Sequence, residues 1–99
     1  MRKGTTPTHI FTLGIETSCL TDLRILYAQD DVILEKHLSD CVLEGETASV
    51  TLTEEETFLF ASDAPVNIQL RLRIGEDVVL TSDPIIVPVK RCLKEEVLI

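Results

Sequence analysis

The chain has 99 residues, of which 44% are hydrophobic and 26% charged, and its 17 acidic and nine basic residues give a net charge of -8. This length and composition predict one folded domain and exclude a disordered chain. The acidic balance argues against nucleic-acid binding, which depends on clustered lysine and arginine. No stretch approaches the ~20 apolar residues of a membrane helix, and no apolar run follows Arg2-Lys3 as in a signal peptide, so we predict a cytoplasmic protein without membrane contact.

A polar segment and a first strand open the chain. Residues 1–7 are polar and predict a flexible N-terminal arm. Thr8 to Leu13 alternates between its two faces and predicts the first strand. We expect residues 8–90 to form the folded domain and residues 91–99 to form a C-terminal tail.

A hairpin and two further strands are predicted next. Residues 23–28 and 32–38 are strand candidates, and the turn residues 29–31 between them predict a hairpin. Residues 41–43 form a short strand candidate that ends in a Glu-Gly-Glu turn. Residues 48–52 alternate apolar and polar side chains, which is typical of a half-buried strand.

Residues 53–56, Thr-Glu-Glu-Glu, have the pattern of a helix capping box. In this motif the Thr53 hydroxyl accepts from the Glu56 amide, and the Glu56 carboxylate accepts from the Thr53 amide. The three acids also suit the positive end of a helix. The pattern predicts a short helical turn near residues 54–60, with Phe58 and one of the two residues after it pointing inward.

Residues 66–74 carry the clearest alternation in the chain, which predicts a central strand with one solvated face. Its apolar face consists of Val66, Ile68, Leu70, Leu72 and Ile74. Residues 78–81 and 85–89 predict a final strand that is interrupted between them. Two prolines in this region cannot donate ladder hydrogen bonds, so the strand is expected at a sheet edge, with a bulge, or both.

Together these elements predict an all-β fold, an immunoglobulin-like antiparallel β-sandwich of about seven short strands with one short helical turn near residues 54–60. A one-turn crossover between two strands is a feature of such sandwiches. The three cysteines, Cys19, Cys41 and Cys92, form no C-x-x-C pair. We therefore expect them to be reduced and buried, and to be neither a redox pair nor zinc ligands.

No residue pattern indicates catalysis, and we predict a protein that is not an enzyme and has no cofactor, metal or small-molecule substrate. His37 and Cys41 would be a nucleophile–base couple, but four residues along a strand separate them by about 13 Å. The consecutive carboxylates of Glu54–Glu56 diverge on a helix and do not converge on one ion. Arg71 and Arg73 would form a small anion-binding strip, although a strip of this kind more often covers a solvated sheet face.

The two termini carry the residues that we predict to bind a protein partner. The tail contains apolar residues outside the strand pattern, which are costly to leave in water at roughly 25 cal/mol per Å². Two interpretations stay open: the tail folds back over an open end of the sandwich, or it docks on a neighbouring subunit as extended termini do. The predicted contact residues are Arg2, Lys3, Thr5, Thr6, Leu93, Val97, Leu98 and Ile99.

The opening Met-Arg-Lys-Gly-Thr-Thr-Pro-Thr-His-Ile-Phe-Thr-Leu resembles that of a family of small proteins encoded in prophages of Firmicutes. The resemblance extends to residues 52–57, 66–73 and 91–98, and thus covers nearly the whole chain. Where the family often has proline after Thr-Leu, this chain has Gly14. The overall pattern is also distantly similar to the N-terminal sandwich domain of phage baseplate upper proteins.

The resemblance implies a non-enzymatic structural or assembly module of a phage particle, in the tail or baseplate, and it brings no catalytic residues. The implied partners are other protein subunits, either copies of this chain or phage structural proteins, and the implied location is the host cytoplasm and then the virion. Edge strands and terminal arms suit such assemblies because they add to neighbours. The alternative is a small acidic adaptor or inhibitor that binds a basic surface of a host protein.

Overall fold

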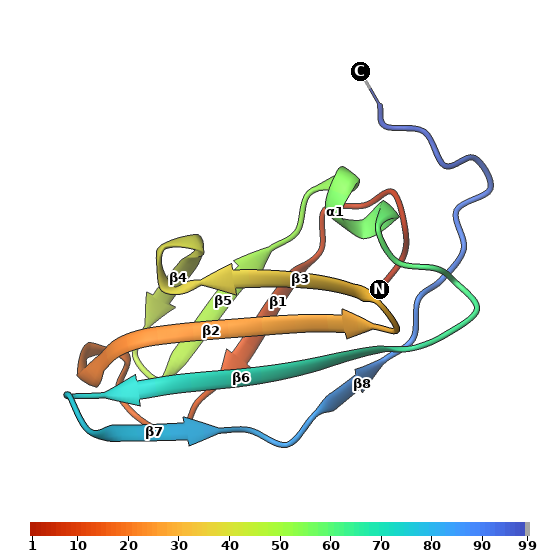
Figure 1. Cartoon of the computed structure of the whole chain (residues 1–99). Helices are drawn as coiled ribbons and strands as arrows, with labels where there is room; N and C mark the ends of the chain where they lie inside the picture. The colour runs from red at the N-terminus through yellow and green to blue at the C-terminus, as the bar shows by residue number, and fades with distance from the viewer. Residues whose placement is uncertain (99) are drawn as a thin grey trace.

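The computed structural model describes residues 1–98 and shows two antiparallel sheets that face each other (Figure 1). The smaller sheet has the strand order β1-β5-β4. The larger sheet has the order β3-β2-β6-β7, and β8 pairs with β6 beside β7. The predicted all-β antiparallel sandwich is confirmed.

Within residues 1–98 the chain forms eight strands, because the predicted last strand is divided in two. The strands are β1 (Thr8–Thr12), β2 (Leu20–Gln29), β3 (Val32–His37), β4 (Cys41–Glu44), β5 (Thr47–Thr51), β6 (Val66–Ile74), β7 (Val78–Thr81) and β8 (Ile85–Val87). The helical elements of the described chain are the 3₁₀ turns η1 (Thr17–Cys19) and η2 (Leu38–Asp40) and the short helix α1 (Glu54–Phe58).

Strand β6 is the centre of the larger sheet, as its alternation predicts. It pairs with β2 along one edge and with β7 and β8 along the other. Four of its five inward apolar residues are buried, from Val66 at 0% to Leu72 at 9% exposure, and Ile74 at the strand end is partly buried. The period of two therefore gives the correct core face over the whole strand.

The core fills the space between the inner faces of the two sheets. Its fully buried members include Tyr27 from the larger sheet, Val50 from the smaller sheet and Phe60 from the segment after α1. Leu59 is half exposed and Phe58 is partly buried. The sequence leaves Leu59 and Phe60 as alternatives for the second inward residue, and the structure shows that it is Phe60.

Helix α1 begins with the predicted capping box. The Thr53 hydroxyl accepts a hydrogen bond of 3.1 Å from the Glu56 amide, and the Glu56 carboxylate accepts one of 2.9 Å from the Thr53 amide. The same carboxylate forms an ion pair of 2.7 Å with Lys36 Nζ of β3. The box therefore fixes the helix start and also holds the helix against the larger sheet.

Strands β7 and β8 form the predicted edge, which is interrupted at residues 82–84. Ser82 continues the pairing across the break, because its amide donates to the Leu70 carbonyl at 2.8 Å and its hydroxyl accepts from the Leu70 amide at 2.9 Å. Pro84 follows, and it has no amide hydrogen to donate. All four residues of β7 are exposed.

The prediction that all three cysteines are buried is wrong for Cys19. It lies at the end of the surface turn η1 and is exposed, whereas Cys41 and Cys92 are partly buried. The buried position of this turn belongs to Thr17, whose hydroxyl donates a hydrogen bond of 2.8 Å to the Gly45 carbonyl. The residue of this turn that is buried is thus the polar Thr17, which forms a hydrogen bond to the neighbouring turn, and not the more apolar Cys19.

Candidate functional site

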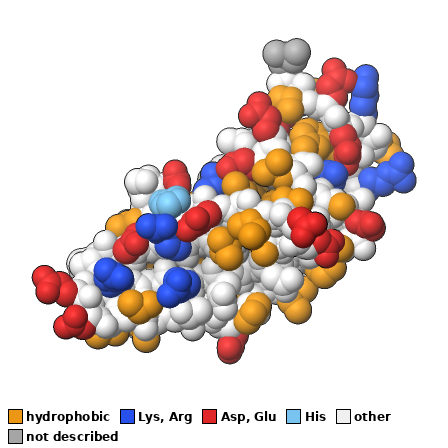
Figure 2. Space-filling model, viewed as in Figure 1, with side chains coloured by type: hydrophobic (Ala, Val, Ile, Leu, Met, Phe, Trp, Pro, Cys, Tyr) orange, Lys and Arg blue, Asp and Glu red, His pale blue; other side chains and the backbone are white. Residues whose placement is uncertain are grey.

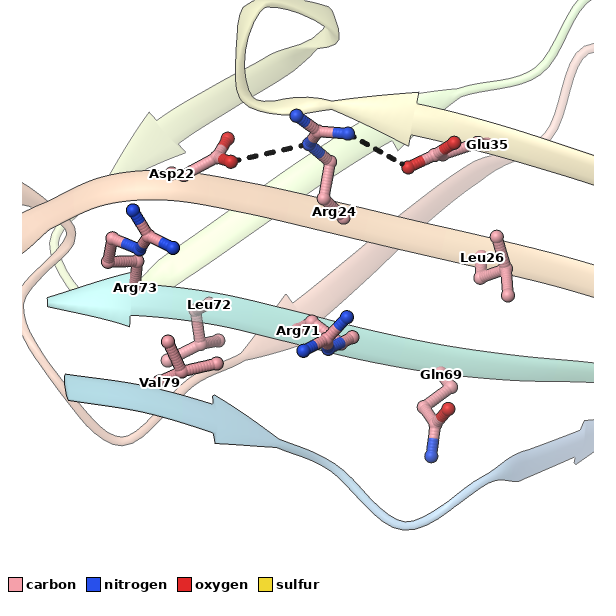
Figure 3. A pocket seen from close by; sticks show the side chains of 9 residues that line it. All are labelled: Asp22, Arg24, Leu26, Glu35, Gln69, Arg71, Leu72, Arg73 and Val79. Carbon is pink, nitrogen blue, oxygen red and sulfur yellow. Dashed lines mark hydrogen bonds and ion pairs between the residues drawn. The ribbon is translucent and has the colours of Figure 1, made fainter. Parts of the chain in front are cut away.

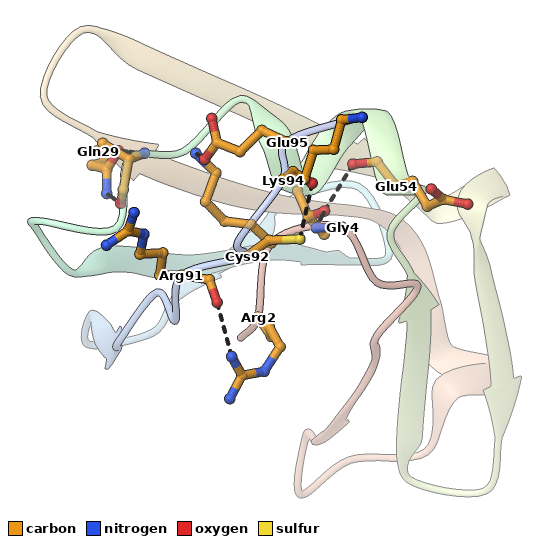
Figure 4. Close-up of polar contacts among 11 residues, drawn as sticks. Arg2, Gly4, Gln29, Glu54, Arg91, Cys92, Lys94 and Glu95 are labelled. Carbon is orange, nitrogen blue, oxygen red and sulfur yellow. Dashed lines mark hydrogen bonds and ion pairs between the residues drawn. The ribbon is translucent and has the colours of Figure 1, made fainter. Parts of the chain in front are cut away.

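The two termini, which carry the predicted partner-binding residues, lie against each other (Figure 4). Arg2 and Lys90 form a parallel bridge, in which the Lys90 amide donates to the Met1 carbonyl at 2.7 Å and the Lys3 amide donates to the Lys90 carbonyl at 3.0 Å. The Arg2 side chain donates to the Arg91 carbonyl at 2.8 Å. The first residues are therefore part of the folded body.

Lys3 and Gly4 explain why the N-terminal residues pack so closely. The side chain of Lys3 is 7% exposed and forms an ion pair with Glu95 of the tail. Gly4 has φ +77°, and a Cβ atom there would lie 3.0 Å from the Phe58 ring and 3.2 Å from Cys92 Sγ. Backbone pairing and a buried charge thus connect residues 1–4 to the C-terminal segment.

Thr5 and Thr6, the other predicted contact residues of the arm, are both exposed. The Thr5 hydroxyl donates to the Arg2 carbonyl at 2.6 Å, so it bonds within its own turn. After them the Pro7 carbonyl accepts from the Leu52 amide at 3.0 Å, which leads the chain into β1. Only these two threonines of the predicted arm present side chains to solvent without a bond to a distant segment.

The C-terminal tail stays close to α1 and to the N-terminal residues as far as Leu98, the last residue that the structure describes. The Leu98 amide donates to a Glu54 carboxylate oxygen at 3.0 Å, and Val97 is partly buried. The side chains of Leu93 and Leu98 are nevertheless 94% and 82% exposed. Ile99, also predicted as a contact residue, lies outside the described residues. The tail therefore bonds to its own chain while two of its leucines stay uncovered.

Sequence reasoning missed a groove on the open side of the sandwich, between the β1 edge and the β7–β8 edge. Its volume is about 370 Å³. Three consecutive residues of β1 and Leu13, which follows the strand, line it, so it runs along the edge of that strand rather than along one of its faces. The lining residues are Ile10, Phe11, Thr12, Leu13, Leu70, Leu72, Leu80, Thr81, Ser82 and Ile85.

The groove is apolar and its rim is exposed. Ile10 is 67% exposed, Leu80 is 46% and Ile85 is 44%. Hydrophobic side chains also appear along the β7–β8 edge in Figure 2. Within residues 1–98, β1 pairs only with β5, and β7 pairs only with β6, so both strands present unpaired backbone groups here. The available signal was the unbroken apolar run of residues 78–80, which lacks the alternation of a half-buried strand.

A second hollow, of about 340 Å³, lies on the outer face of the larger sheet and contains Arg24, Arg71 and Arg73 (Figure 3). The last two are the arginines of the predicted solvated face, and both are exposed. Basic side chains gather over the left ends of β2 and β6 in Figure 2. The sequence did not place Arg24 with them, because their meeting depends on the pairing of β2 with β6.

Burial favours the neutral forms of His9, Tyr27 and Cys41. Burial lowers the pKa of His9 and raises the pKa of Tyr27, and His9 Nδ1 and Tyr27 Oη share a hydrogen bond of 2.7 Å. Burial, with the nearby Asp40 charge, also raises the pKa of the Cys41 thiol, which donates to the His37 carbonyl at 3.4 Å. A thiol that stays protonated is a weak nucleophile. This cluster is therefore suited to packing and not to covalent catalysis.

No protein-family model, curated protein or solved structure matches this chain. In the part that the structure describes, no group of three or more His, Cys, Asp or Glu residues is arranged to hold a metal ion. The described helices are all too short and too polar to cross a membrane. A function is therefore best argued from the apolar groove and the arginine hollow.

Proposed function

We propose that this chain is a non-enzymatic assembly module that binds an extended segment of another protein subunit along the open side of its sandwich. The observation that carries the proposal is an apolar groove flanked by two strand edges that lack partners within residues 1–98. The groove lies between the sheets, so an occupant would contact both of them.

The exposed edge is protected against pairing at its interruption, where Asp83 and Pro84 lie, but not within β7 and β8 themselves. Soluble proteins blunt such edges with lysine, proline or inward-pointing charges. Strand β7 has the sequence Val-Val-Leu-Thr, with none of these residues, and β8 has Ile-Ile-Val. Apolar edges of this kind mark sites of interaction with other chains. The groove thus has the chemistry of an interface rather than of a solvated surface.

An extended segment is the occupant that fits both parts of the groove. Its backbone would pair with the free groups of β1 or β7, and alternate apolar side chains would pack on the floor formed by Leu70 and Leu72. A helix would leave the edge amides and carbonyls without partners, which is costly once the bound helix displaces water from the groove. The proposed partner is therefore an apolar strand-forming segment of a neighbouring subunit.

The resemblance to prophage-encoded proteins supports a phage particle as the setting, in the tail or baseplate. Particles of this kind repeat the same contact around a symmetry axis, and strand addition between neighbours is one way to make it. In this setting the chain leaves the host cytoplasm as a component of the virion.

The test compares lysine substitutions on the two edges of the smaller sheet. Ile10 of β1 and Val42 of β4 pair with the same residue, Ser49, and are 67% and 69% exposed. Ile10 lines the groove and Val42 does not. The variants are Ile10→Lys, Leu80→Lys at the opposite rim, and Val42→Lys as the matched control.

The measurement is the amount of chain in purified phage particles produced from each variant gene, by quantitative mass spectrometry. We expect Ile10→Lys and Leu80→Lys to lower incorporation at least tenfold, and Val42→Lys to leave it unchanged, with melting temperatures that confirm folding. Equal incorporation of all three variants would refute the groove as the contact. Absence of the wild-type chain from particles would refute the phage setting.

A further inference from the structure

Three arginines meet in the hollow on the outer face of the larger sheet (Figure 3). Arg24 of β2 lies directly opposite Arg71 of β6, and Arg73 lies opposite Asp22. These arginines are a third of the nine basic residues in a chain of net charge -8. Like charges opposite each other on neighbouring strands destabilise a sheet. A bound anion would offset that cost.

The two carboxylates of this arginine hollow are both bound to one arginine. Arg24 Nε lies 3.3 Å from an Asp22 oxygen, and Arg24 Nη1 lies 3.1 Å from a Glu35 oxygen. The ion pairs found among residues 1–98 include neither Arg71 nor Arg73. Two guanidinium groups of the hollow therefore remain for a ligand.

The spacing of Arg71 and Arg73 matches an extended acidic chain. They lie two residues apart on one face of β6, a separation of about 7 Å, which is also the spacing of alternate side chains on a bound strand. Each guanidinium binds a carboxylate through two parallel hydrogen bonds. Leu26 and Val79 line the hollow beside them, and apolar walls strengthen charge pairs by excluding water.

We propose that the arginine hollow binds an acidic, extended segment of another protein chain, with carboxylates at alternate positions. Gln69 limits the site at one end, because its side-chain amide is bound to the Ser82 carbonyl at 3.0 Å. Nucleic acid fits less well, since its phosphates require basic groups along a path rather than in one hollow of an acidic protein. The arginines of this site lie on the outer face of the larger sheet, although Leu72 lines both the hollow and the groove, and the inference does not rest on the proposed function.

The test is a titration of the isotope-labelled protein, followed by NMR, with the synthetic peptide Thr-Glu-Val-Glu-Val-Glu-Thr and with its Gln-for-Glu counterpart. We expect the acidic peptide to shift amide resonances of β2, β6 and β7, and to bind at least tenfold more tightly than the Gln peptide. The double variant Arg71→Gln/Arg73→Gln should lose at least tenfold in affinity. The double variant Lys90→Gln/Arg91→Gln removes the same charge elsewhere and should bind as the wild type does.

Three results would overturn the proposal. Equal affinity for the two peptides would remove the carboxylate requirement, and unchanged affinity in Arg71→Gln/Arg73→Gln would place binding elsewhere. Tighter binding of a short DNA duplex than of the acidic peptide, at the same salt concentration, would make nucleic acid the ligand. The groove variant Leu80→Lys should retain its affinity for the acidic peptide. The peptide titration therefore tests the arginine hollow, and the incorporation experiment tests the groove, independently of each other. The arginine variant should also keep its melting temperature, because it removes like-charge repulsion.

Discussion

The two long sides of the sandwich differ in whether the chain crosses between the sheets. On one side the three residues of η2 (Leu38–Asp40) connect the edge strands β3 and β4 directly, and the Lys36–Glu56 ion pair ties β3 to α1. On the other side, within residues 1–98, no chain segment leads directly from β1 to β7 or β8, and the terminal segments beyond β1 and β8 meet only near one end, at the Arg2–Lys90 bridge. The first side is closed by the protein's own chain, and the second is left open.

The consequence is visible in the apolar side chains of the edges. On the closed side Val32, Leu34 and Leu38 are partly buried against the core. On the open side Leu80 of β7 lines the groove and is 46% exposed, whereas Ile33 and Val42 of the closed edges are 63% and 69% exposed but do not line it. Burying apolar surface contributes roughly 25 cal/mol per Å² of stabilising free energy, so a partner that covers the apolar side chains of the open side would gain binding free energy from their burial. The η2 connection thus accompanies the partial burial of Val32, Leu34 and Leu38 on one side, and the groove on the other side stays open to a partner.

The largest effect that distinguishes the two sides should come from a matched pair of core leucines. Leu23 of β2 and Leu72 of β6 pair across the sheet, with Leu23 one strand nearer the closed side and Leu72 lining the open groove. Leu23→Ala leaves an enclosed cavity and should cost about 3–5 kcal/mol of unfolding free energy, whereas Leu72→Ala enlarges a groove that water enters and should cost about 2 kcal/mol.

Urea unfolding of the two alanine variants measures this difference directly. A wild-type reference and equal slopes against urea are the controls. If Leu72→Ala costs as much as Leu23→Ala, the groove is filled in solution, and the open side is closed by something other than the described chain.

Local patterns in the sequence predict the parts of the fold that depend on neighbours in the chain. The alternation of residues 66–74 identifies the core face of β6, because side chains on a strand repeat every two residues. The Thr53 and Glu56 pair predicts the start of α1, since a capping box is complete within four residues. The edge position of the last strand follows from its prolines in the same way.

Features that depend on pairing between distant segments could not be predicted. Lys3 is buried because its segment pairs with Lys90 and because Glu95 lies beside its ammonium group. The arginine hollow depends on the strand register that places Arg24 opposite Arg71. The net charge of -8 gives no indication of this local basic cluster. Strand pairing is non-local, so a single sequence without that register does not show these neighbours.

A smaller effect should loosen the closed side alone. Thr53→Ala removes the hydroxyl that accepts from the Glu56 amide and should cost about 1 kcal/mol. Because Glu56 also binds Lys36, amide exchange in β3 should quicken more than exchange in β7. Ser62→Ala, an exposed position in the same connection, is the control and should change stability by less than about 0.5 kcal/mol. Equal protection of β3 in both variants would argue against the box as a closure of this side.

The smallest effect is a difference in how acid acts on the two sides. On the closed side, burial alone would raise the pKa of Glu56, but hydrogen bonds from Lys36 and Thr53 outweigh it, and the pKa is lowered. The stability that this pair contributes is present above the unfolded pKa, near 4.5, and is lost as the pH falls below it. On the β1 side, burial lowers the pKa of His9 from its ordinary value of 6.5.

The sign for His9 follows from which state takes up the proton. As the pH falls through 6.5, the unfolded chain protonates its histidine, while the folded chain keeps the ring neutral beside Tyr27. Unfolding therefore becomes easier as the pH falls through 6.5, before the Glu56 pair is affected. His9→Gln should flatten the stability profile in that upper range only, and Glu56→Gln should flatten it only below about pH 4.5. Thermal unfolding measured at half-unit pH steps separates these two effects. If the stability profile of His9→Gln parallels that of the wild type above pH 5, protonation of the His9 ring beside Tyr27 does not destabilise the fold.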